Sequence, residues 1–210
     1  MNSTASDVEQ PPKVNFLVIF IVGPSGIGKS AILRKFMATA GARFKPVSLD
    51  DIAAEEGRVR GLIQDQNAFT LLKKVGTETL FMIGITSLFR RLGGASDGEI
   101  YLVDVGAGFQ NVAMLASLSS LYPVVVITAS EDVAFERFCK YRSTDRSFDK
   151  YKHIEYSLVR RKIYASATHQ IDTTDLSLDE AAIQFGKVVR RIANRQSTLD
   201  NQDSNSRKKG

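Results

Sequence analysis

The chain has 210 residues, of which 43% are hydrophobic and 24% are charged, so it is long enough to form one domain with an ordinary buried core. Its longest apolar run, Phe16 to Val22, is far shorter than the roughly 20 residues that span a bilayer, which predicts no transmembrane helix. The N-terminus lacks a signal-peptide pattern, and the single cysteine, Cys139, permits no internal disulfide. Together these features predict a reducing, cytoplasmic setting.

The net charge of +5 is concentrated at the C-terminal end. Residues 187–210 contain seven basic and two acidic side chains, while the basic and acidic residues of the remaining chain balance. A protein that binds duplex nucleic acid carries its positive charge on the folded body. We therefore expect no nucleic-acid partner and no membrane partner.

Short apolar runs alternate with amphipathic stretches between two polar ends. Residues 1–12 are predicted to form a flexible leader, residues 13–195 a single domain, and residues 196–210 a disordered basic tail. Five runs are typical of buried strands: Val14–Val22, Lys45–Leu49, Glu99–Val105, Tyr122–Thr128 and Thr168–Asp172. Four stretches between them are helical in composition and length: Lys29–Ala40, Gln110–Ser120, Glu131–Tyr141 and Leu178–Arg195. This alternation predicts an α/β fold with a parallel sheet.

The segment from about Asp51 to Gly98 is too long for a single crossover helix between the second and third strands. We expect two or three additional helices there. This region includes the apolar run Leu80–Ile85, which belongs either to the core or to an interface.

A phosphate-binding motif follows the first strand. Residues 23–30, Gly-Pro-Ser-Gly-Ile-Gly-Lys-Ser, fit the pattern Gly-x4-Gly-Lys-Ser/Thr and open a helix, as this motif requires. The loop is expected to surround phosphates with backbone N–H groups, Lys29 to reach the β- and γ-phosphates, and Ser30 to hold Mg²⁺. The alternative is a glycine-rich turn without a ligand. The predicted nucleotide-binding residues of the loop are Gly23, Ser25, Gly26, Ile27, Gly28, Lys29, Ser30 and Ala31.

Acidic residues follow two other strands, at the edge of a parallel sheet where ligands bind. Asp104 ends the third strand and is a candidate magnesium residue, or else a cap of the next helix. Asp50, or less strongly Asp51, is a candidate to orient an attacking hydroxyl group, or else a helix N-cap. Gly106 and Gly108 would let a substrate approach the backbone closely, or else form a tight turn.

A basic segment lies between two predicted helices. Residues 137–162 contain nine basic and three acidic side chains. The polar middle of this segment, residues 142–152, is predicted to be a lid whose cations reach the bound phosphates when the lid closes. The alternative is a solvated basic face.

These motifs in this order resemble the shikimate kinases, which share the P-loop fold of the nucleoside monophosphate kinases. The resemblance covers roughly residues 14–194. Beyond the phosphate loop, it is carried by Ser48-Leu-Asp50, residues 105–108, the basic lid, Arg160-Arg-Lys-Ile-Tyr164, Ile171-Asp-Thr173 and the helix start at residues 176–180.

The resemblance implies a three-layer sandwich around a five-stranded sheet in the order 2-3-1-4-5, with substrate-binding helices at residues 51–98. It implies transfer of the γ-phosphoryl group of ATP, with Mg²⁺, to a hydroxyl of a small carboxylated metabolite, with shikimate the best single candidate and aromatic amino acid biosynthesis the setting. The protein is expected to be a monomer or a weak homodimer.

The resemblance also implies roles for particular residues. Asp50 would orient the accepting hydroxyl, and Arg146, with Arg142 as the second choice, would be the lid arginine. The substrate-binding residues would be Asp50, Gly106, Ala107, Gly108 and Arg160, of which Arg160 would pair with the substrate carboxylate.

The chain departs from the family at three positions. Ser48 stands where the family has an aspartate, which leaves Asp104 as the candidate replacement on the magnesium side. Ala107 interrupts the glycine triplet, and Thr70 stands where a second carboxylate-binding arginine is expected. The alternatives are therefore a kinase for a sugar acid or a nucleoside monophosphate, and a catalytically degenerate nucleotide-binding regulatory module.

Overall fold

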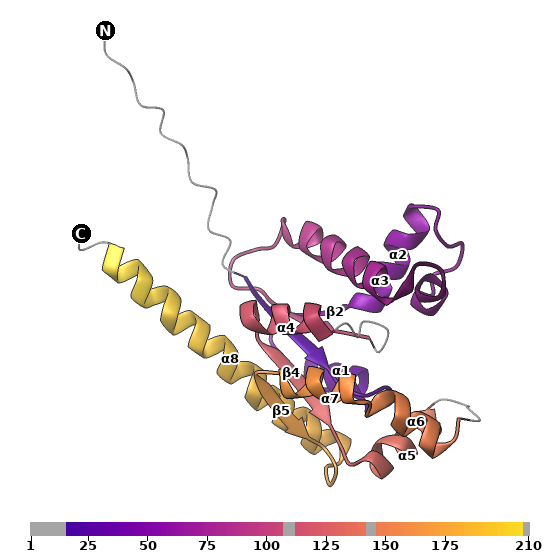
Figure 1. Cartoon of the computed structure of the whole chain (residues 1–210). Helices are drawn as coiled ribbons and strands as arrows, with labels where there is room; N and C mark the ends of the chain where they lie inside the picture. Colours follow the sequence, from indigo (N-terminus) through magenta and orange to yellow (C-terminus); the bar gives the residue numbers. More distant parts are fainter. Residues whose placement is uncertain (1–15, 107–111, 142–145, 208–210) are drawn as a thin grey trace.

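The computed structural model describes residues 16–106, 112–141 and 146–207. A five-stranded parallel sheet forms its centre (Figure 1). The strands are β1 (Leu17–Val22), β2 (Phe44–Ser48), β3 (Ile100–Asp104), β4 (Val124–Thr128) and β5 (His169–Asp172). Their order, β2-β3-β1-β4-β5, confirms the predicted topology.

The central strands β1, β3 and β4 are mostly buried because they are apolar on both faces of the sheet. In β1, Phe20 belongs to one hydrophobic core and the neighbouring Ile19 and Ile21 belong to the other. This arrangement explains why β1 is a continuous apolar run in the sequence rather than an alternating one.

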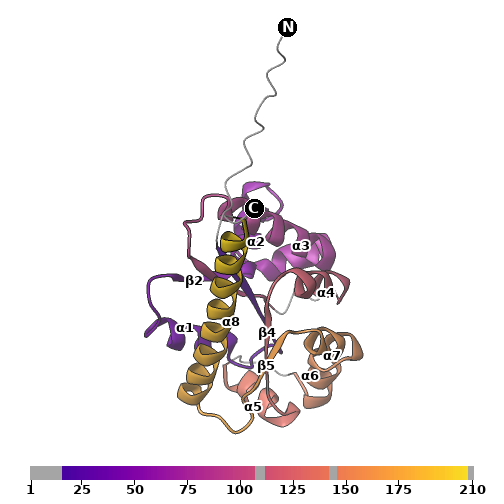
Figure 2. The same ribbon diagram turned by 90° about the vertical axis from the view of Figure 1, so that its left-hand side faces the viewer.

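Helices cover both faces and complete the predicted three-layer sandwich. Side chains of α2, α3, α4 and α7 enter one core, and side chains of α1, α5, α6 and α8 enter the other. Figure 2 shows α8 running across its face of the sheet beside α1. The helices are α1 (Lys29–Met37), α2 (Leu49–Val59), α3 (Ala68–Leu92), α4 (Val112–Leu121), α5 (Glu131–Tyr141), α6 (Phe148–Glu155), α7 (Leu158–Ala165) and α8 (Leu178–Arg207).

The long segment between β2 and β3 forms α2 and α3, which pack on each other (Figure 1). The backbone of α3 leaves helical geometry at Gly76, where φ is 80° and ψ is 169°, so α3 is a kinked pair of helices. Within the apolar run, Leu80, Phe81 and Ile83 are buried, which assigns most of this run to the core.

Two of the predicted segments include helical residues. Helix α8 continues through residues 196–207 of the predicted C-terminal tail. Extending an existing helix fixes one residue per added hydrogen bond, which is much less costly than starting a new one. Residues 148–152 of the predicted lid belong to α6, and Tyr151 is fully buried. Residues 142–145 of that lid lie outside the described ranges.

No helix within the described ranges is long and apolar enough to cross a membrane.

The core between α8 and α1 gives a test of this packing. Phe185 of α8 is fully buried, and the centre of its ring lies 5.4 Å from the centre of the Phe36 ring in an edge-to-face contact. We expect Phe185→Ala to lower the free energy of unfolding by about 3–5 kcal/mol, because it removes the aromatic contact and leaves a cavity. Ile183→Ala is the matched control, since Ile183 is 58% exposed on the same helix. Urea denaturation of both variants checks the difference, and equal losses would contradict this packing.

Candidate functional site

The carboxyl ends of β1, β2 and β3 meet at one edge of the sheet. In the strand register, Asp104 lies opposite Ser48 on one side and Ile21 on the other. A pocket of about 440 Å³ opens above this edge. It is lined by Ser25, Gly26, Gly28, Lys29, Ser30, Ala31, Arg34, Ser48, Asp50, Asp104, Gly106 and Tyr141. Phosphate-loop, metal and acceptor residues predicted from separate parts of the sequence therefore share one pocket.

The phosphate loop connects β1 to α1. Gly28 is the N-cap of α1, so the positive end of the helix dipole faces the pocket. Lys29 is 8% exposed, and its Nζ donates hydrogen bonds to the carbonyls of Gly23 (3.0 Å) and Pro24 (3.2 Å). These bonds hold the ammonium group against the loop, where a bound phosphate would meet it.

Ser30 and Asp104 form a direct contact across the sheet edge. The Ser30 hydroxyl donates a 2.7 Å hydrogen bond to Oδ2 of Asp104, and Oδ1 of Asp104 is buried with no hydrogen-bond partner within the described ranges. Mg²⁺ prefers oxygen ligands and is commonly held by one or two carboxylates together with substrate phosphates. These two residues fit a nucleotide-bound Mg²⁺. In the same ranges, no group of three or more His, Cys, Asp or Glu residues forms a cation cage.

Asp50 lies in the first turn of α2, with its carboxylate against the backbone of Gly106. A Cβ atom on Gly106 would overlap this carboxylate, so a larger residue there would displace Asp50. The N-cap of α2 is Ser48, whose hydroxyl accepts a 3.2 Å hydrogen bond from the Asp51 N–H group. The N-cap is therefore Ser48 rather than either aspartate, and Asp50 lines the pocket.

A second pocket, of about 380 Å³, adjoins the first and shares Gly28, Ala31 and Tyr141 with it. It lies between α1, α5 and the connection from β5 to α8. Arg137 of α5, which lines it, donates hydrogen bonds to the hydroxyl and carbonyl of Thr173 (2.8 Å each) and to the Leu176 carbonyl (3.3 Å). The mixture of apolar walls and fixed polar groups is typical of a site for a ligand ring.

The sequence interpretation missed this second pocket. Arg137 and Tyr141 were only members of a basic segment, and the Ile-Asp-Thr sequence was only part of a family pattern. The signal lies in the approach of two distant segments, which a single sequence does not reveal.

Two of the predicted site arginines, Arg146 and Arg160, contact other side chains of the protein. The Arg146 guanidinium lies 5.2 Å from the centre of the Phe138 ring, and Arg160 forms an ion pair with Glu155. Neither residue lines the two pockets described above. Burial lowers the pKa of Arg160, although an arginine stays cationic at neutral pH. The predicted site residues Ala107, Gly108 and Arg142 lie outside the described ranges.

Thr70, which stands where a second carboxylate-binding arginine was expected, is bonded to another residue of the chain. The Thr70 hydroxyl donates a 2.9 Å hydrogen bond to Asp65, close to the start of α3. Arg60, the C-cap residue of α2, donates a 2.8 Å hydrogen bond to Glu56 of that helix.

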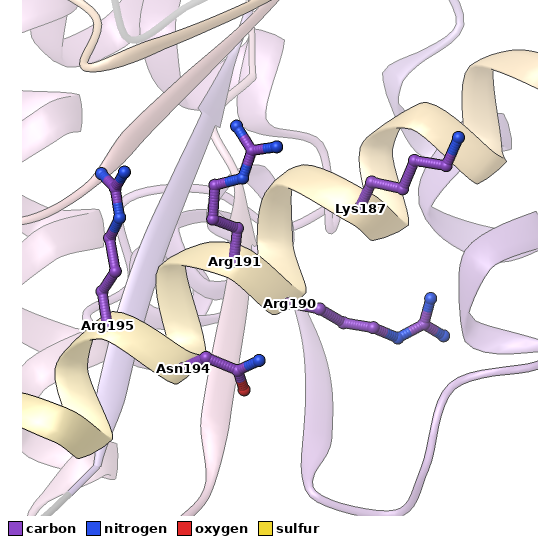
Figure 3. A pocket seen from close by; sticks show the side chains of 5 residues that line it. All are labelled: Lys187, Arg190, Arg191, Asn194 and Arg195. Atoms are coloured by element: carbon purple, nitrogen blue, oxygen red, sulfur yellow. The ribbon is translucent and has the colours of Figure 1, made fainter.

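The positive C-terminal charge forms a separate feature of α8. Lys187, Arg190, Arg191, Asn194 and Arg195 line a surface pocket of about 510 Å³ (Figure 3). All five residues come from α8. Because a helix rises 1.5 Å per residue, Arg195 lies about 20 Å further along α8 than Ala181, which lines the second pocket. None of the five residues lines either of the two pockets described above.

Comparisons with known proteins give structural likenesses only. No family model matches the sequence, and no curated protein matches it. A shikimate kinase from Bacteroides thetaiotaomicron has 13% identity and a TM-score of 0.60, and the match covers 83% of this chain and 98% of that one. A tunicamycin resistance protein from Deinococcus radiodurans has 14% identity, a TM-score of 0.57 and coverages of 83% and 96%. A gluconokinase from Sinorhizobium meliloti 1021 has 16% identity, a TM-score of 0.54 and coverages of 87% and 97%.

These likenesses show that the chain has the fold of the shikimate kinases and related P-loop kinases, as the sequence predicted. The chain covers almost the whole length of each solved structure, so the match is to a complete domain. At such low identity, the likenesses establish the fold and leave the acceptor to the site residues.

The contact between Ser30 and Asp104 predicts a magnesium effect. We expect Ser30→Ala to reduce the gain in ATP affinity on adding Mg²⁺ by about tenfold, because it removes a ligand oxygen and the donor to Asp104. Ser25→Ala is the matched control, since Ser25 lines the same pocket and the hydrogen bonds seen for it use backbone atoms. Calorimetric titration with ATP, with Mg²⁺ and with EDTA, measures the effect. An unchanged magnesium effect in Ser30→Ala would contradict the assignment.

Proposed function

We propose that this protein is an ATP-dependent small-molecule kinase that transfers the γ-phosphoryl group to a hydroxyl group of a small metabolite. The observation that carries the proposal is the convergence of Lys29, the pair of Ser30 and Asp104, and Asp50 on one pocket. These residues belong to the start of α1, the end of β3 and the start of α2.

Each residue has a role that follows from its chemistry. Lys29 and the backbone N–H groups of the loop bind the phosphates and offset their charge. Mg²⁺, when bound at Ser30 and Asp104, would further neutralise charge on the phosphate oxygens. Asp50 accepts a hydrogen bond from the acceptor hydroxyl and orients its oxygen toward the γ-phosphorus.

The transfer step then balances as a simple displacement. The hydroxyl oxygen forms a bond to the γ-phosphorus, the bond from this phosphorus to the bridging oxygen breaks, and ADP leaves with the electron pair. The proton of the hydroxyl passes to the carboxylate of Asp50. The second pocket, with Arg137 at its wall, is the proposed site for the adenine ring.

Shikimate is the first acceptor to test, because the shikimate kinases have this fold. D-gluconate is the second, because a gluconokinase also has it. A nucleoside monophosphate and a neutral polyol complete the panel. They are included because Thr70 stands where the family has a second carboxylate-binding arginine, so the prediction of a carboxylated acceptor depends on Arg160 alone. The cytoplasmic setting stays a prediction, as does the monomeric or weakly dimeric state.

Lys29 provides a test of nucleotide binding. We expect Lys29→Ala to weaken MgATP binding by about one to two decades, because it removes a charge-assisted contact to the phosphates. The loss should be accompanied by abolished transfer. Calorimetric titration and coupled ADP release check the two results, and unchanged turnover would contradict the mechanism.

Asp50 provides a test of the acceptor role. We expect Asp50→Asn to lower acceptor-dependent ADP release by about 10²–10⁴-fold with MgATP affinity preserved, because the amide does not take up the proton. Asp51→Asn is the matched control, since Asp51 is exposed on the next position of α2 and does not line the pocket. ATP binding without turnover on the whole panel would instead support the regulatory module.

A further inference from the structure

Two side chains of helix α6 form hydrogen bonds to the backbone of the phosphate loop. The N–H group of Ser25 donates a 2.9 Å hydrogen bond to Oε2 of Glu155, and the Ser25 carbonyl accepts a 2.9 Å hydrogen bond from the Tyr151 hydroxyl. Tyr151 and Glu155 are four residues apart, so they project from the same face of α6. Both are almost completely buried, with exposures of 0% and 2%. Two side chains of one helix thus fix both polar backbone groups of one loop residue.

Aromatic packing fixes the same part of the loop. A Cβ atom on Gly26 would overlap Phe138 of α5, so only glycine lets the loop approach this ring so closely. The Phe138 ring lies 4.9 Å from that of Tyr151, and the Arg146 guanidinium lies 5.2 Å from the centre of the Phe138 ring. The loop, α5 and α6 therefore form one packed unit, in which a change at α6 is felt at the loop.

The position of Glu155 raises an electrostatic problem. Ser25 lines the proposed phosphate pocket, so a buried carboxylate bonded to its backbone lies close to where the phosphates bind. An uncompensated negative charge there would repel ATP, and the low polarity of the interior would strengthen this repulsion. The structure provides the compensation in Arg160, which forms an ion pair with the same Oε2 atom of Glu155 and whose side chain is only 12% exposed.

We propose that Glu155 is a positioning residue for the phosphate loop and that Arg160 is the counter-charge that makes this buried carboxylate compatible with a bound triphosphate. The proposal rests on the nucleotide binding proposed above. It gives Arg160 a different role from the one that the family resemblance implied, which was to pair with a carboxylate of the acceptor. An acceptor carboxylate at Arg160 would have to compete with the buried Glu155, which is already bonded to both Arg160 and the Ser25 N–H group.

The two roles predict different effects of removing the Arg160 charge. As a counter-charge, Arg160 protects ATP affinity, and its loss is repaired by also removing the charge of Glu155. As an acceptor clamp, Arg160 affects the KM for the acceptor, and removing the charge of Glu155 repairs nothing. Glu155→Gln suits this test because the amide oxygen of glutamine still accepts the hydrogen bond from Ser25.

The experiment is a double-mutant cycle of Arg160→Met and Glu155→Gln in the full chain, read by calorimetric titration with MgATP. AMP is the control ligand, because it lacks the two outer phosphates. We expect Arg160→Met to weaken MgATP binding about tenfold or more and to change AMP binding by less than about twofold. The double variant should return to within about threefold of the wild-type MgATP affinity. Arg161→Met is the matched control, because Arg161 is exposed and pairs with Glu131, and it should bind MgATP like the wild type.

A second pair of variants applies if Arg160→Met does not fold, as a thermal melt would show. Arg160→Met with Glu155→Gln, and Arg160→Met with Glu155→Ala, both lack the buried charges. They differ in the acceptor for the Ser25 N–H group. If Glu155 positions the loop, the alanine form should bind MgATP about tenfold more weakly than the glutamine form.

Several results would overturn the inference. These are wild-type MgATP affinity in Arg160→Met, equal losses for MgATP and AMP, no repair by Glu155→Gln, or equal affinities in the second pair. A raised acceptor KM with unchanged MgATP affinity in Arg160→Met would restore the clamp role. A wild-type protein that does not bind MgATP would overturn the proposed function together with this inference, whereas failed repair in a protein that binds MgATP overturns the inference alone.

Discussion

The hydrogen bond between Ser30 and Asp104 depends on a single constraint, the parallel register of β1 and β3. Parallel strands end at the same edge of a sheet, so the loop after β1 and the last residue of β3 must meet. The register places Asp104 opposite Ile21, immediately before the residues that lead into the loop. A shift of β3 by one residue would turn the Asp104 side chain to the opposite face of the sheet and separate the two halves of the phosphate pocket.

The residues at the end of β2 have separate roles. The Ser48 hydroxyl caps α2 by accepting a hydrogen bond from the Asp51 N–H group. An aspartate at this position could not use the same carboxylate oxygen both to cap the helix and to bind Mg²⁺. Asp50, two residues later, is thereby left facing Gly106 and the pocket. The absence of a Cβ atom at Gly106 is what admits the carboxylate. In this arrangement Ser48 has the structural role at this edge and Asp104 has the proposed metal role.

The features predicted correctly from the sequence are those that are local or set by sheet topology. The apolar run of β1 and the glycine spacing of the loop follow from short patterns, and the strand order was implied by the family resemblance. The features that the sequence did not predict are pairs of side chains distant in the chain. Ser25 and Glu155 are 130 residues apart, and Arg137 and Thr173 are 36 residues apart. In one sequence Glu155 was merely one of three acidic residues in a basic segment, and nothing indicated that it would be buried against the phosphate loop.

The charges around the pocket bear on the kind of acceptor. Of the described residues that line it, the cations are Lys29 and Arg34, and both come from α1 on the nucleotide side. The acceptor side contributes Asp50, whereas Asp104 is bonded to Ser30 at the proposed magnesium position. With Arg160 paired to Glu155, a carboxylate entering from that side meets the acidic Asp50 and gains no new cation from these lining residues. This balance is better matched to an acceptor that presents uncharged hydroxyl groups, because a hydroxyl donates to Asp50 without carrying a charge into the pocket.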